Sequence, residues 1–261
     1  MAIDSYAVLL AAGIGKRTGL SIPKQMLKIK NREIILHSLD IFIRSKINFR
    51  AVIITVPPAE AFNFNWDGFF GERIPLTSLK KIRVITGGAE RQESVLKSIQ
   101  FLDGLIPETK KDGSVIFIHD SARPFVLEGE IESLLRSVSV SGASFLCSNV
   151  SETVKEIYTP EHDLKLLSTA KIAEKFKTLD RRRLVSAKTP QVFKYPIIKK
   201  ALEKAAEEGF YSTDDVSLVE NINVKAFPLI SSDYNIKITT FVDLEIARCL
   251  FTHFKKVDKK K

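Results

Sequence analysis

Short runs of apolar and β-branched residues alternate along this chain with segments of helical periodicity, and this alternation constrains the fold more than any other feature. Strands are expected at Tyr6–Ala11, Arg50–Val56, Lys81–Ile85, Val115–His119, Ala143–Ser148 and Val224–Leu229. Helices are expected at Ile34–Arg44, Arg91–Leu102, Gly129–Val140, Pro196–Glu208, Asp214–Asn221 and Phe241–Phe254. Strands that alternate with helices form right-handed βαβ units. The sequence therefore predicts an α/β fold, a Rossmann-like three-layer αβα sandwich around a mostly parallel, twisted sheet.

Two segments interrupt this alternation. Residues 57–79 are rich in Phe, Asn, Gly and Pro and predict a long connection with one helix. Residues 149–183 are polar, with β patterns at Thr153–Tyr158 and Lys165–Thr169, and predict a protruding β-arm. We expect a single domain over residues 1–254, with this arm as an excursion from it, followed by a flexible basic tail over residues 255–261.

Composition limits the class of protein. The chain has 261 residues, which is enough to bury a sizeable core, and its net charge is +9. Only two cysteines are present, and no signal peptide or membrane helix is predicted, so we expect a cytoplasmic protein with neither a disulfide framework nor a membrane partner. A nucleic-acid partner is the alternative that the charge suggests. No predicted helix or strand interleaves basic and aromatic residues, however, and small anionic substrates explain the internal cations better.

A glycine-containing loop follows the first strand. It reads Ala11-Ala12-Gly13-Ile14-Gly15-Lys16-Arg17, with Lys24 seven residues further on. Glycines after a buried strand let backbone N–H groups approach an anion closely. The loop matches neither the P-loop pattern nor the dinucleotide-binding pattern. A plain tight turn with surface cations is the simpler interpretation of this loop taken alone.

Two further predicted strands also end in residues that could bind a phosphorylated ligand. The strand at 115–119 runs into Asp120 and Arg123, where a carboxylate could bind a ribose hydroxyl or a metal ion and a guanidinium could hold a phosphate. The strand at 81–85 runs into Gly87-Gly88, with Ser94 in the first turns of the next helix. Because ligands of parallel sheets bind beyond the carboxyl ends of the strands, these loops predict one shared site. Each loop alone is also compatible with an ordinary turn.

Taken together, the motifs resemble those of the 2-C-methyl-D-erythritol 4-phosphate cytidylyltransferases. The resemblance covers residues 6 to about 250. The matching motifs, in chain order, are Ala11-Ala12-Gly13-x-Gly15-x-Arg17, Pro23-Lys24-Gln25, Gly87-Gly88-x-x-Arg91-x-x-Ser94-Val95, His119-Asp120-x-x-Arg123-Pro124, Leu179-Asp180-Arg181 with Thr189-Pro190-Gln191, Thr213-Asp214-Asp215 and Asn235-Ile236-Lys237-Ile238-Thr239.

The resemblance implies an enzyme that joins CMP from CTP to a sugar-alcohol phosphate in isoprenoid precursor synthesis. It implies catalytic roles for Arg17, Lys24 and Lys237. It implies nucleotide contacts from Ala11, Ala12, Gly13, Gly15, Gly88, Ser94 and Asp120. It implies sugar-phosphate contacts from Arg123, Thr153, Arg181, Thr189 and Thr213, with the arm residues acting across a homodimer. The cofactor implied is Mg²⁺, bound mainly through CTP phosphates, with Asp120 the one candidate protein ligand.

Three alternatives remain open at the level of sequence. Ribitol-5-phosphate cytidylyltransferases share much of this motif set. A non-catalytic nucleotide-binding protein on the same fold is expected to have lost Lys24 or Arg123, and both are present. Either of the neighbours Arg182 and Arg183 could take the place given to Arg181.

Overall fold

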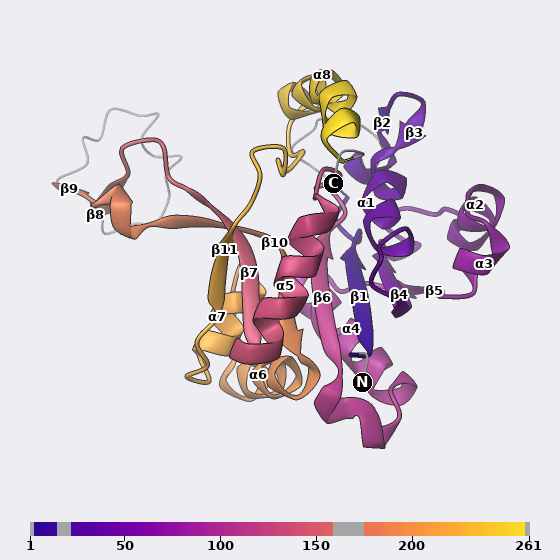
Figure 1. Ribbon diagram of the computed structural model, residues 1–261, viewed down its shortest axis with the longest axis horizontal. Coiled ribbons are helices and arrows are strands. Elements are labelled where there is room, and N and C mark those ends of the chain that lie inside the picture. Colours follow the sequence, from indigo (N-terminus) through magenta and orange to yellow (C-terminus); the bar gives the residue numbers. More distant parts are fainter. Residues whose placement is uncertain (1–2, 15–21, 159–174, 259–261) are drawn as a thin grey trace.

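The computed structural model describes residues 3–14, 22–158 and 175–258. Within them a seven-stranded sheet has the order β11-β7-β10-β6-β1-β4-β5, with helices on both faces (Figure 1). Its strands are β1 (Ser5–Leu10), β4 (Phe49–Val56), β5 (Ile82–Thr86), β6 (Val115–Asp120), β7 (Ala143–Asn149), β10 (Val185–Lys194) and β11 (Phe227–Ile230). The α-helices are α1 (Ile34–Ile43), α2 (Trp66–Arg73), α3 (Leu76–Leu79), α4 (Arg91–Leu105), α5 (Glu128–Ser141), α6 (Tyr195–Glu208), α7 (Asp215–Glu220) and α8 (Phe241–Asp258). This arrangement confirms the predicted α/β fold.

The central strand β1 sets the register of the sheet. It lies parallel to β4 on one side and to β6 on the other, and its last residue, Leu10, is level with Thr55 of β4 and Asp120 of β6. Three strands therefore end at one edge of the sheet. In Figure 1 β1 runs away from the N-terminus toward the end of the molecule where α8 lies.

Strand β10 is the one described strand of the large sheet that runs antiparallel to its neighbours. It pairs with β6 through Gln191–Lys194 and with β7 along most of its length, with a register shift between Ala187 and Gln191. This strand was not predicted from the sequence. Its first three residues are exposed and it contains Pro190, so it lacks the apolar run that marks the other strands.

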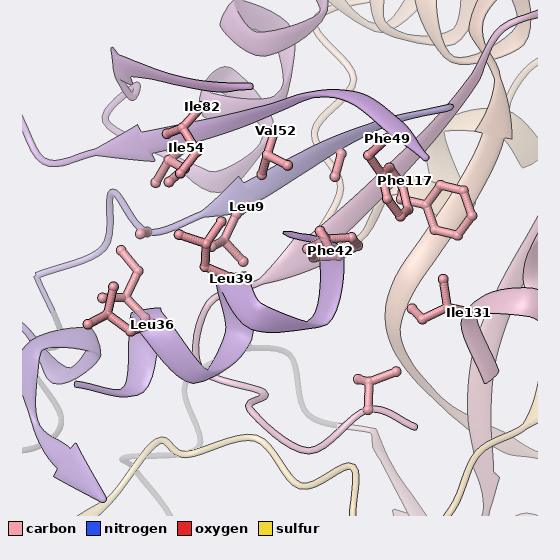
Figure 2. Close-up of a cluster of buried hydrophobic side chains, with 14 of the residues drawn as sticks. Leu9, Leu36, Leu39, Phe42, Phe49, Val52, Ile54, Ile82, Phe117 and Ile131 are labelled. Carbon is pink, nitrogen blue, oxygen red and sulfur yellow. The ribbon is translucent and has the colours of Figure 1, made fainter. Parts of the chain in front are cut away.

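Alternate residues of the strands face two separate cores. Leu9 packs on one face with α1, α2 and α5, where Leu39 and Phe42 lie against the sheet (Figure 2). Val8 packs on the other face with α4, α6 and α7. This period of two is what a sheet covered on both sides requires. Two glycines in the left-handed region end the covering helices: Gly142 follows α5 with φ 81° and Gly209 follows α6 with φ 62°.

The remaining elements lie outside the large sheet. The short strands β2 (Lys28–Ile29) and β3 (Arg32–Glu33) pair with each other, and Ile29 of β2 packs with α8 in a third apolar cluster. The strands β8 (Lys155–Tyr158) and β9 (Lys175–Thr178) form a separate antiparallel pair that projects from the sheet in Figure 1. The 3-10 helices are η2 (Lys24–Met26), η3 (Glu108–Gly113) and η5 (Arg181–Arg183).

Three expectations about these elements need correction or comment. Residues 57–79 hold two helices, α2 and α3, rather than one, packed around the aromatic cluster of Phe64, Trp66 and Phe69. The tail was predicted to start at 255, but α8 continues to Asp258, because Phe254 and Val257 pack in the third cluster. The β pattern predicted at 165–169 lies outside the described residues, and the strand that pairs with β8 is at 175–178.

Candidate active site

The loop after β1 is anchored on both sides. The backbone N–H of Ala11 donates to the carbonyl of Thr55 at 2.9 Å, which continues the pairing with β4. The side-chain amide of the buried Gln25, on η2, donates to the carbonyl of Ala11 at 2.5 Å. Ala12 is half-buried, and Gly13 is exposed, with open space where a side chain would stand. The predicted site residues Gly15 and Arg17 lie outside the described residues.

A second glycine loop touches the first. A Cβ added at Gly87 would lie 2.3 Å from the Cβ of Ala12, so only glycine lets the two loops approach this closely. The N–H of Gly88 donates to the hydroxyl of Ser94 at 3.0 Å, and that hydroxyl donates to the carbonyl of Glu90. Ser94 therefore points into the loop as predicted, and it holds the loop in shape.

Asp120, at the end of β6, lies among three cations. Lys237 places its Nζ 2.7 Å from Oδ2 of Asp120, Arg91 places its Nε 3.4 Å from Oδ1, and Arg123 places its Nε 3.7 Å from Oδ2. Burial raises the pKa of Asp120, but Arg91 and Lys237 oppose burial more strongly and hold this pKa well below its ordinary value. The predicted residues Asp120, Arg123 and Lys237 are thus in direct contact.

Arg91 belongs to this group, although the sequence analysis gave it no role. It begins α4 and holds Asp215, at the start of α7, through Nη1–Oδ1 and Nη2–Oδ2 contacts of 2.9 and 2.7 Å. The backbone N–H of Asp215 in turn donates to the side chain of the buried Gln191. The three cations around Asp120 face two carboxylates, so the cluster keeps one net positive charge. The signal for Arg91 was its place inside the second glycine motif.

The remaining predicted residues are distributed over several elements. Thr189 is buried in β10, and its hydroxyl accepts a hydrogen bond from the N–H of Asp120 at 3.0 Å. Lys24 is half-buried on η2, beside Gln25. Thr213 is exposed just before α7. Thr153 and Arg181 are exposed near the β8–β9 pair, where Arg181 donates to the carbonyl of Ser151. Within the described ranges neither of these two makes a hydrogen bond or ion pair with the Asp120 cluster.

Metal ligands are sparse in the parts of the chain that the structure covers. No three His, Cys, Asp or Glu side chains there gather into a metal-binding group. Asp120 is the single carboxylate among the predicted site residues, and it could supply one ligand to an ion that phosphates hold. None of the described helices is both long enough and apolar enough to span a bilayer.

The fold and this edge define the class of protein. It is an α/β protein with a parallel-strand edge at which glycine loops, a buried carboxylate and a net positive charge come together, as in doubly wound proteins that bind phosphorylated ligands. A profile of the 2-C-methyl-D-erythritol 4-phosphate cytidylyltransferase family matches residues 5–253. The chain belongs to this family.

Individual relatives agree with this assignment. The chain is 33% identical over 250 residues to the 2-C-methyl-D-erythritol 4-phosphate cytidylyltransferase of Clostridioides difficile, with 95% of this chain and 94% of the relative covered. It is 32% identical over 249 residues to the Bacillus velezensis protein of the same name, with 95% and 96% covered. The crystal structure of the Francisella tularensis enzyme superposes with a TM-score of 0.70 at 29% identity and covers 94% of this chain and 99% of its own.

Proposed function

We propose that this chain transfers CMP from CTP to 2-C-methyl-D-erythritol 4-phosphate and releases pyrophosphate, giving 4-diphosphocytidyl-2-C-methyl-D-erythritol. The observation that carries the proposal is the positively charged cluster around Asp120, at the same sheet edge as two touching glycine loops. The relatives that match over nearly their whole length bear the name of this activity. Ribitol 5-phosphate is the competing acceptor, and the relatives do not favour it.

The reaction needs no enzyme nucleophile. An oxygen of the sugar-alcohol phosphate attacks the α-phosphorus of CTP in line, and pyrophosphate leaves. Two anions must approach each other while charge builds on the phosphoryl oxygens, so catalysis consists of positioning and electrostatic stabilisation. In our proposal Lys24 and Arg17 face the triphosphate, while Arg123 and Lys237 hold the acceptor phosphate beside Asp120.

In this proposal the glycine loops and Ser94 form the binding site for the nucleotide. The close approach of Gly87 to Ala12 brings the two glycine loops together, and we propose that Ala11, Ala12, Gly13 and Gly88 form one cradle for the nucleotide. Mg²⁺ is the cofactor we propose. It supplies positive charge at the triphosphate when bound there, and Asp120 is the one site carboxylate that could join its ligands.

We also propose that the β8–β9 pair is an arm that reaches a second copy of this chain. An isolated two-stranded sheet is marginally stable in water, and Thr153 and Arg181 on this arm make no contact with their own chain's Asp120 cluster. In a homodimer these two residues would complete the partner's acceptor site.

Subunit mixing tests the arm. Lys24→Ala and Arg181→Ala are each expected to abolish most pyrophosphate release. In a mixed dimer, the Arg181→Ala chain has an intact Lys24, and the Lys24→Ala chain supplies an intact arm to that site. Mixing the two inactive variants should therefore restore pyrophosphate release. Mixed dimers that are detected by native mass spectrometry yet stay inactive would contradict the shared site.

The activity itself is tested with wild-type protein, CTP, Mg²⁺ and either methylerythritol phosphate or ribitol 5-phosphate. We expect pyrophosphate release with a kcat/KM that is higher for methylerythritol phosphate. Faster turnover of ribitol 5-phosphate, or none with either acceptor, would refute the proposed function.

A further inference from the structure

Five residues at the end of β6 are joined in a closed ring of hydrogen bonds. The ring of His119 meets the carbonyl of Arg123 through Nε2 and the hydroxyl of Thr189 through Nδ1, both at 3.0 Å. Arg123 Nη1 donates to the carbonyl of Asn235 at 3.2 Å, and Asn235 Nδ2 donates to the carbonyl of Thr189 at 3.1 Å. Asp120 joins the ring at two points, because its N–H donates to the Thr189 hydroxyl and its carbonyl accepts from the N–H of Arg123 at 3.0 Å. The ring thus includes Asp120 and Arg123, two proposed ligand-binding residues.

The geometry fixes the tautomer of His119. A carbonyl oxygen only accepts hydrogen bonds, so Nε2 must carry the proton that it shares with Arg123. In a neutral ring Nδ1 is then an acceptor, and the Thr189 hydroxyl must donate to it. His119 is fully buried, and both of its ring nitrogens are taken up by these two contacts.

The hydroxyl of Thr189 is therefore occupied on both sides. It donates to His119 and accepts from Asp120. The resemblance matched Thr189 to the acceptor-substrate side of the site, but a buried hydroxyl with both of these bonds made has little left to offer a ligand. Thr189 therefore affects substrate binding indirectly, by holding the residues to which it is hydrogen-bonded.

Arg123 depends on the ring for its orientation. Its Nε lies 3.7 Å from Asp120 Oδ2, too far for a hydrogen bond, and this buried nitrogen has no hydrogen-bond partner among the described residues. Its guanidinium is fixed by the contact from Nη1 to Asn235, and its backbone by the carbonyl contact with His119 and the N–H bond to the carbonyl of Asp120. The ring, rather than a tight salt bridge, holds this guanidinium in place.

We propose that His119, Thr189 and Asn235 are positioning residues for the phosphate of the acceptor substrate: His119 orients the Thr189 hydroxyl that holds Asp120, and His119 and Asn235 hold Arg123 directly. The inference rests on the proposed function for the identity of that substrate. None of the three side chains needs to touch the substrate for this role. They join β6, β10 and the segment before α8 at the edge of the sheet where the candidate site lies.

Steady-state kinetics with both substrates tests the proposal. His119→Phe keeps the ring volume and removes both hydrogen bonds, and Thr189→Val removes the hydroxyl alone. Each is expected to lower kcat/KM for the acceptor phosphate by about tenfold, a factor of the size of one hydrogen bond's net contribution, because Asp120 and Arg123 are then held less firmly. The KM for CTP should change less. The double variant should also lose about tenfold and not a hundredfold, because both changes break the same unit. Thr189→Ser keeps the hydroxyl and should recover most of the loss.

His37→Phe is the matched control. His37 is also buried, and its Nε2 also meets a carbonyl, that of Ile29, at 3.0 Å, but it belongs to no part of the ring. This variant should lower the melting temperature without changing the kinetics for either substrate. An unchanged kcat/KM in folded His119→Phe beside a large loss in Thr189→Val would mean that the hydroxyl touches the substrate directly, and the proposal would be wrong. Losses that multiply in the double variant would overturn it too.

The tautomer of His119 can be tested in the wild-type protein, without any variant and without measuring activity. Nitrogen-15 NMR of the wild-type protein should show His119 neutral, protonated on Nε2 and hydrogen-bonded at Nδ1. A proton on Nδ1 would break the ring and overturn the proposal. If the wild-type protein turns over neither sugar phosphate, the proposed function fails. The NMR result still shows whether the hydrogen-bonded ring around His119 exists.

Discussion

Arg91 and Asp215 are 124 residues apart in the chain, and their side chains meet through two parallel hydrogen bonds of 2.9 and 2.7 Å. Asp215 has no exposed surface, whereas Arg91 also reaches Asp120 at the sheet edge. The contact thus joins the first residue of α4 to the first residue of α7 and fixes one of the cations of the candidate site. Because a planar guanidinium matches a carboxylate at two points, the pair defines an orientation as well as a distance.

Removal of this arginine should strongly destabilise the fold. Arg91→Ala leaves the carboxylate of Asp215 buried without its partner, and the free energy of unfolding is expected to fall by about 3–5 kcal/mol. Urea unfolding of the wild type and the variant measures the change. Arg182→Ala is the control, since Arg182 makes the same two-point contact with Asp180 in an exposed position and should leave the unfolding midpoint unchanged. Equal midpoints for Arg91→Ala and the wild type would contradict the prediction.

Lys24 should matter for the chemical step and not for the fold. Lys24→Ala is expected to lower kcat by about 10²–10³-fold, by analogy with the loss of one group that stabilises charge in a transition state. Lys28→Ala is the control, since Lys28 lies four residues further on and its exposed side chain pairs with Glu33 at 3.6 Å. It should turn over normally. Near-normal release by folded Lys24→Ala would remove Lys24 from the mechanism.

The contact between the glycine loops predicts a defect specific to the nucleotide. In Gly87→Ala the new Cβ would lie 2.3 Å from Ala12 and 2.8 Å from the Ser94 hydroxyl, so the two loops must separate. We expect a raised KM for CTP, measured at saturating acceptor. Gly104→Ala is the control. An added Cβ there meets nothing within 4 Å, and alanine in the helix α4 should raise stability by about 0.5–1 kcal/mol with unchanged kinetics. A normal KM for CTP in Gly87→Ala would show that the cradle tolerates the wider spacing.

Burial of His119 predicts a loss of stability in mild acid. Its pKa is lowered to about 4 in the folded protein, compared with an ordinary value near 6.5. Between these values the unfolded chain binds a proton that the folded chain does not, so stability is full above pH 6.5 and falls as the pH drops toward 4. The fall attributable to this residue is about 3 kcal/mol. Urea unfolding at intervals from pH 7 to pH 4 measures it.

The comparison that isolates this effect is between the wild type and His119→Phe. The pKa of His37 is lowered as well, also by burial, so some loss of stability in this range should remain in the variant. Asp243 titrates below this pH range. Burial alone would raise its pKa, but hydrogen bonds donated by Thr239 and Thr240 lower it to about 2. Equal pH slopes for the variant and the wild type would show that His119 does not titrate as its burial requires.

Elements with strong periodicity could be predicted from the sequence, and elements set by tertiary contacts could not. All six predicted strands and six predicted helices are present, although β11 begins at Phe227 and not at Val224. Strand β10 was missed because its first half is exposed and its second half contains Pro190. What makes it a strand is its place between β6 and β7, which no local pattern reveals.

The same distinction applies to the candidate site. Asp120, Arg123 and Ser94 could be predicted as candidates because glycines and strand ends mark ligand-binding loops. The partnership of Arg91 with Asp215, and the ring through Asn235, join residues more than 40 positions apart. A single sequence carries no record of such pairs, so these contacts required the structure.

The register shift in β10 has a consequence for how this molecule could be altered. Val185–Ala187 pair only with β7, whereas Gln191–Phe193 pair with both β6 and β7. An irregularity between two paired stretches bends the strand and interrupts its hydrogen-bond ladder, so the register of one half is not fixed by the other. The outer half leads out to the β8–β9 pair, so residues of that projection other than Thr153 and Arg181, which we propose meet a partner, can change in nature or at the bench while the alignment beside Asp120 stays as it is.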